Sequence, residues 1–239
     1  MPEETTPPAA PPATPPAGPA LGGPVVRALG AGCLGCGGLV LVAVLALVGV
    51  LLWNASDGTD LPRVAPREMA DRAVRNSQEA YDVMGFTRAL QPGEEPGEGG
   101  AGTRNTLGAQ YCYDGGPLGL EDRTVDGAYG MYHEWALDQV PAGRAVPGLR
   151  RLRRRLREDG WDVSSYREGG SGEDWSLFVR RDGGERMSFT WSPRRRYFTG
   201  GATVPCAYDP GWTAGAGGFW SPDSAAGSVT PPVLAPGRL

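Results

Sequence analysis

Two groups of arginines are the strongest candidates for chemistry in this chain of 239 residues. Six arginines fall within Arg150–Arg157, and three more are consecutive at Arg194–Arg196. Guanidinium groups bind carboxylates and phosphates in a bidentate fashion. At about 100° per helical residue, four arginines of the first group share the face opposite a leucine stripe. The predicted anion-binding residues are Arg150, Arg151, Arg154, Arg155, Arg194, Arg195 and Arg196. A solvated helix face in an arginine-biased chain is the alternative.

Catalytic chemistry has little support. His133 is the only histidine and lies in a strand-like segment, so we expect a structural role; an envelope hydrolase with His133 as base is the alternative. No nucleophile-elbow motif frames a serine. The chain has no lysine, which removes Schiff-base catalysis and the phosphate-loop lysine. One histidine argues against a zinc site. We therefore predict no catalytic residues, no metal and no cofactor.

The cysteines divide into two pairs. Cys112 and Cys206 each lie in strand-like sequence, far apart in the chain. An isolated pair in an exported domain is most simply a disulfide that closes a long loop, so we predict a Cys112–Cys206 bond. Cys33 and Cys36 form a C-x-x-C pattern without a neighbouring strand or second ligand pair, and we predict no redox or metal role for them.

Residues 28–56 contain no charged side chain, and residues 37–53 are almost entirely apolar. About 20 apolar helical residues cross a bilayer core, so we predict one transmembrane helix over 28–53 and an integral membrane protein. Small residues four apart in this segment leave a homodimer through the helix as an alternative.

Two features of the sequence give opposing indications of the side of the membrane on which the domain lies. Arginines after the apolar run favour a cytosolic domain, whereas the cysteine pair favours the oxidising side. We expect the domain outside the plasma membrane. A cytosol-facing domain whose basic helix binds anionic lipid or nucleic acid is the alternative, although the net charge of −4 makes nucleic acid an unfavourable partner.

Composition and periodicity give the organisation of the chain. We predict a disordered Pro/Ala-rich tail (1–27), the membrane helix (28–53), a stalk (54–64), an extracytoplasmic α+β domain (65–212) and a disordered Gly/Pro/Ser-rich tail (213–239). Three- and four-residue spacing indicates helices over 66–89 and from Pro147 to Gly160. Period-two alternation indicates strands over 106–113, 128–140, 161–166, 174–181, 185–192 and 197–208, with a loop over 91–102. The predicted fold class is α+β: one transmembrane helix followed by a two-layer domain of antiparallel sheet with two helices on one face.

Four segments carry a resemblance to a known group of proteins: Asp126–Pro141, Val146–Leu152, Gly160–Val163 and Gly201–Pro210. They resemble uncharacterised single-pass membrane proteins of high-GC actinobacteria. The resemblance implies a cell-envelope location and supplies no activity. Together with the arginine clusters it leads us to expect a non-enzymatic, membrane-anchored binding or interaction module of the bacterial cell envelope. Its expected partner is an anionic envelope component or another protein.

Overall fold

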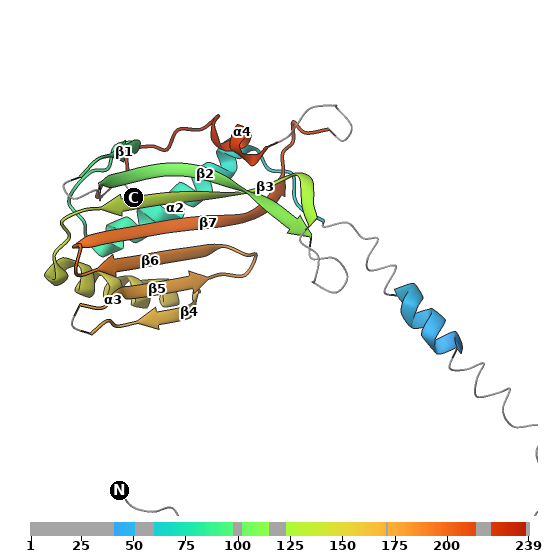
Figure 1. The fold of residues 1–239 in the computed structure, drawn as a ribbon, viewed down its shortest axis with the longest axis horizontal. Helices are drawn as coiled ribbons and strands as arrows, with labels where there is room; N and C mark the ends of the chain where they lie inside the picture. The colour runs from blue at the N-terminus through green and yellow to red at the C-terminus, as the bar shows by residue number, and fades with distance from the viewer. Residues whose placement is uncertain are drawn as a thin grey trace, which may run out of the picture. The chain divides into compact units, whose positions relative to one another are not determined.

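The computed structural model describes residues 41–50, 60–97, 102–114, 123–170, 172–213 and 221–237 (Figure 1). The chain divides into two units, 1–50 and 51–239, which are described separately. The predicted tail at 1–27, the C-x-x-C pattern and the small residues of the predicted dimer contact lie outside the described residues.

The prediction of a transmembrane helix is corrected. Within the first unit, residues 41–50 are helical, and the rest of the predicted span lies outside the described residues. In the part of the chain that the structure describes, no helix has both the length and the apolar character needed to cross a membrane.

The second unit is built on one antiparallel sheet of seven strands, in the order β1-β2-β3-β7-β6-β5-β4. The predicted fold class is also corrected here, because the strands form a larger single sheet than the predicted one. The strands are β1 (Gly93–Glu95), β2 (Thr103–Asp114), β3 (Arg123–Leu137), β4 (Asp162–Arg167), β5 (Trp175–Arg180), β6 (Arg186–Ser192) and β7 (Tyr197–Tyr208). The added strand, β1, lies in the segment predicted as a loop.

Three helices belong to this unit: α2 (Pro66–Met84), α3 (Ala142–Glu158) and α4 (Pro222–Ala226). Pro66 opens α2, where its missing N–H costs nothing, and Gly85 ends it in the left-handed conformation with φ 73°. Helix α3 begins one turn before the predicted start and contains Pro147. Burial of Ala145 extends the leucine stripe into this extra turn, which explains the earlier start.

The two halves of the domain have the same order. Each half is a helix followed by an antiparallel meander, and the last strands of the two halves, β3 and β7, pair at the centre of the sheet. Figure 1 views the sheet from its uncovered face, with α2 and α3 behind it. One face is therefore packed against helices, and the other carries the outward-pointing side chains of the central strands.

An aromatic cluster forms the main core between the sheet and the helices. Trp135 stacks on Phe198 at a centroid distance of 5.5 Å and meets Tyr81 of α2 edge-on at 5.1 Å. The indole also lies against Gly200, where a β-carbon would come within 2.2 Å of the ring. A glycine is thus required on β7 beneath this tryptophan.

The predicted disordered tail over 213–239 is corrected for residues 221–237. Leu234 is buried and exchanges both backbone hydrogen bonds with Leu90, at 2.8 and 3.0 Å. The Gln78 side chain of α2 donates to the Ala235 carbonyl at 2.6 Å. This segment, the C-terminal strap (residues 229–237), extends the core beyond the boundary that composition suggested. Pro62 and Val64 of the predicted stalk likewise bond to Tyr208 at the end of β7.

Candidate functional site

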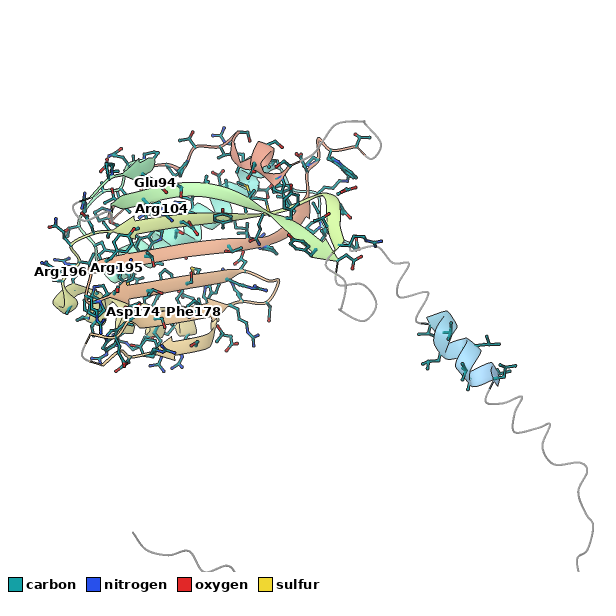
Figure 2. All side chains as sticks on the ribbon, in the orientation of Figure 1. Glu94, Arg104, Asp174, Phe178, Arg195 and Arg196 are labelled. Carbon is teal, nitrogen blue, oxygen red and sulfur yellow. A yellow bond between two sulfur atoms is a disulfide. The ribbon has the colours of Figure 1, made fainter. Side chains whose placement is uncertain are left out.

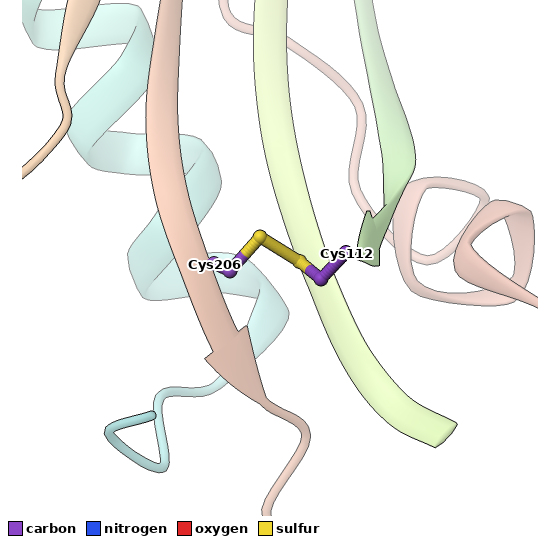
Figure 3. Close-up of a disulfide and its surroundings, with 2 residues drawn as sticks. All are labelled: Cys112 and Cys206. Atoms are coloured by element: carbon purple, nitrogen blue, oxygen red, sulfur yellow. A yellow bond between two sulfur atoms is a disulfide. The ribbon is translucent and has the colours of Figure 1, made fainter. Parts of the chain in front are cut away.

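The predicted Cys112–Cys206 disulfide is confirmed, with Cα atoms 6.0 Å apart and a sequence separation of 94. The cysteines belong to β2 and β7, the two strands that flank β3. Figure 3 shows the sulfur bridge passing in front of β3, with α2 behind the sheet. The register of both flanking strands shifts at this level, beside Tyr111 and beside Tyr129. These irregularities bring the outer strands close enough for a bond across the middle one.

His133 is fully buried and takes part in a polar network that holds the C-terminal strap. Its Nε2 lies 2.7 Å from Asn105 Oδ1. The Asn105 amide nitrogen donates to the carbonyls of Leu90 and Pro232, at 3.1 and 2.9 Å. Since this fixes the amide orientation, Nε2 of His133 must carry the proton and donate. Burial lowers the pKa of the imidazole to about 4, so the ring is neutral at physiological pH. A base has to reach its substrate, and this one is enclosed.

The network predicts a specific pH dependence of stability. Because the folded-state pKa of His133 is below the ordinary value of about 6.5, acid stabilises the unfolded chain. The contribution of His133 to the free energy of unfolding is fully present above pH 6.5 and is lost as pH falls towards 4. The total loss is about 3 kcal/mol. Urea unfolding of the wild type and of His133→Gln at a series of pH values measures this. The substitution should remove that part of the acid sensitivity, and identical pH profiles would contradict the assignment.

The arginines of α3 have partners within the domain. Arg150 makes a bidentate contact with Glu168 at 3.0 and 3.2 Å, and its guanidinium lowers the pKa of that carboxyl. Arg151 donates to the Met84 carbonyl at 2.8 Å, which satisfies a backbone acceptor at the end of α2. Arg155 pairs with Asp159 at 2.8 Å. Three of the four predicted anion-binding residues on this helix therefore have structural contacts.

The remaining candidates lie on α3 and on the β6–β7 turn. Arg154 is exposed and has no ion-pair or hydrogen-bond partner among the described residues. Arg194 approaches Gly172 in the β4–β5 loop, the same loop that carries the Arg150 partner Glu168. The turn holds Arg194, Arg195 and Arg196. Both clusters thus border one loop, but its carboxylates offset their charge. An anion-binding role for these arginines stays a prediction.

The uncovered face of the sheet has a hollow of about 620 Å³ over β2, β3, β7 and β6. The polar residues that line it are Arg104, Gln110, Tyr132, His133, Glu134, Ser188, Thr199 and Thr203, of which His133 is itself fully buried. Arg104 lies between two carboxylates, 2.9 Å from Glu94 and 3.2 Å from Glu134; Figure 2 shows it beside Glu94. This end of the hollow therefore carries one guanidinium and two carboxylates, a net negative charge, and the rest of its lining is uncharged.

Tyr132 forms an aromatic surface within this hollow. It pairs with Gly108 on β2, and a β-carbon on Gly108 would come within 2.3 to 2.7 Å of three atoms at the far end of the tyrosine side chain. The ring therefore lies across the glycine, along the sheet. Tyr132 is partly exposed at this position.

A second hollow, of about 450 Å³, continues the first along the uncovered face. The two share Ser188 and Thr203, and the second extends along β6 to Arg186 and over β5 with Phe178 and Arg180. Phe178 is 42 % exposed and is labelled on this face in Figure 2. The two hollows form a continuous polar surface across the strands, which we call the sheet-face groove.

Sequence reasoning missed this groove. Period-two alternation indicates which side chains point away from the core, but the groove depends on β3 lying beside β7. The one local signal was the small pair Gly200-Gly201, which leaves room above β7.

Neither family models, curated proteins nor solved structures match this chain. In the described ranges, no cluster of three or more histidine, cysteine, aspartate or glutamate side chains could hold a metal ion. The argument for function therefore depends on the geometry of the domain itself.

Proposed function

We propose that this protein is a non-catalytic binding module of the bacterial cell envelope, and that its ligand lies in the sheet-face groove. One observation carries the proposal: the helices cover a single face of the sheet, and the other face has a broad polar hollow on rigid central strands. Side chains fixed on strands keep their positions when a ligand binds, so little ordering entropy opposes association.

Two further features support this function. A disulfide that joins strands of the core is typical of a domain that folds in an oxidising compartment, which agrees with an extracytoplasmic location. The full burial of His133 and its hydrogen bond to Asn105 favour a binding module over the hydrolase alternative, in which His133 is the base. The groove itself presents hydroxyl, amide, carboxylate and guanidinium groups, which suit recognition of a polar ligand.

The test is a substitution that fills the groove. Ser188 is exposed and lines both hollows, so Ser188→Trp should block them without entering the core. We expect the purified protein to cosediment with isolated actinobacterial cell envelopes, and Ser188→Trp to weaken binding at least tenfold. Arg75→Trp adds the same side chain at an exposed position of α2 and should bind as the wild type does. Equal retention of Ser188→Trp and wild type would contradict the proposal.

A further inference from the structure

We infer that the ligand of the sheet-face groove is an extended acidic polysaccharide, bound across the strands with a carboxylate at Arg186. The inference rests on the proposed function and names its ligand class. Three properties of the groove support it: the chemistry of its lining, its length, and the charge at its β5–β6 end.

The chemistry of the lining matches sugar hydroxyls. Neighbouring hydroxyls of a pyranose ring bind planar groups with two polar atoms, and Arg104, Gln110 and Glu134 supply a guanidinium, an amide and a carboxylate. The serine and threonine hydroxyls between them both donate and accept. Because Arg104 is shared by two carboxylates, this end has a net negative charge, so an uncharged stretch of sugar suits it and the ligand's own carboxylate has to lie elsewhere.

Two aromatic side chains provide surfaces for the apolar faces of sugar rings. Tyr132 lies across Gly108 and is partly exposed, and Phe178 is exposed on the same face of the sheet. One aromatic is on β3 and the other on β5. Strands lie about 4.8 Å apart, so the groove from β2 to β5 is about 19 Å long. An oligosaccharide of several units has this reach.

The β5–β6 end carries excess positive charge. Arg180 and Arg186 lie directly opposite each other on paired strands, an unfavourable arrangement of like charges. Arg180 pairs with Asp162 at 2.8 Å, whereas Arg186 has no ion-pair partner among the residues that the structure describes. A carboxylate on the ligand would complete this arrangement, and it would do so beside Phe178 and Ser188.

Titration calorimetry with oligosaccharides of equal length tests the inference. The probes are cellohexaose and its counterpart oxidised to the carboxylate at C6. We expect the carboxylated probe to bind at least tenfold more tightly than the neutral one. Arg186→Gln should remove this difference, Ser188→Trp should weaken both probes, and Arg75→Gln, at an exposed position of α2, should change neither. Equal affinity for the two probes, or an unchanged preference in Arg186→Gln, would overturn the inference.

Two controls distinguish this inference from the proposed function and from non-specific ion exchange. If neither probe binds while Ser188→Trp still abolishes binding to envelopes, the acidic-polysaccharide inference is wrong and the binding module remains. If dextran sulfate binds as tightly as the carboxylated probe, and Arg154→Gln weakens both as much as Arg186→Gln does, the interaction is ion exchange and the inference is overturned. Unchanged envelope binding in Ser188→Trp would overturn the proposed function itself.

Discussion

Replacement of both Cys112 and Cys206 by serine is expected to lower the free energy of unfolding by about 4 to 5 kcal/mol. The bond closes a loop with a sequence separation of 94, and its loss releases that restriction on the unfolded chain. For a domain whose total stability is of the order of 5 to 15 kcal/mol, this is a large share. Guanidinium unfolding monitored by tryptophan fluorescence measures the difference.

The matched control for this prediction is chemical reduction. A reducing agent should destabilise the wild type by the same amount as the double substitution, and it should leave the double variant unchanged. A wild-type unfolding midpoint that does not respond to reductant would show that the disulfide contributes nothing to stability.

Removal of the indole of Trp135 should cost about 3 to 5 kcal/mol. The side chain is 1 % exposed and contacts rings from α2, β6 and β7. Gly200 lies directly against it and has no side chain that could fill the resulting cavity. Thermal and urea unfolding of Trp135→Ala measure the loss.

Trp175 gives a tryptophan control in the same sheet. It is partly exposed on β5 under the Arg150 guanidinium, with 5.3 Å between the guanidinium carbon and the ring centroid. Trp175→Ala should cost about 1 to 2 kcal/mol, because less apolar area is buried. Similar losses for the two variants would mean that the aromatic cluster is not the centre of the core.

The elements of the domain follow from sequence where the pattern is local. Alternation on either side of Asp182–Gly184 predicts the β5–β6 hairpin, and Pro66 and Gly85 mark the ends of α2. The predictions of the number of strands and of a membrane helix were wrong. Strand β1 and the C-terminal strap depend on contacts between residues far apart in the chain, such as Leu90 with Leu234, and no local pattern encodes those.

The candidate site was harder to predict from the sequence than the fold was. Helical spacing placed the arginines of α3 on one face, but it could not show that Arg151 satisfies a carbonyl of another helix. Burial of His133 followed from its apolar neighbours, whereas its partner Asn105 belongs to a different strand. The groove depends on strand order, and strand order arises from the pairing of two long central strands that are distant in sequence.

The position of the disulfide also determines how the domain would respond to tension. A pull on the two ends of the chain passes from β2 to β7 through the sulfur bridge. Helix α3, strands β3 to β6 and β7 as far as Cys206 lie within the closed loop, so the force bypasses them. Under load, α2 and the C-terminal strap would extend first, while every strand of the sheet-face groove except β2 stays mechanically shielded.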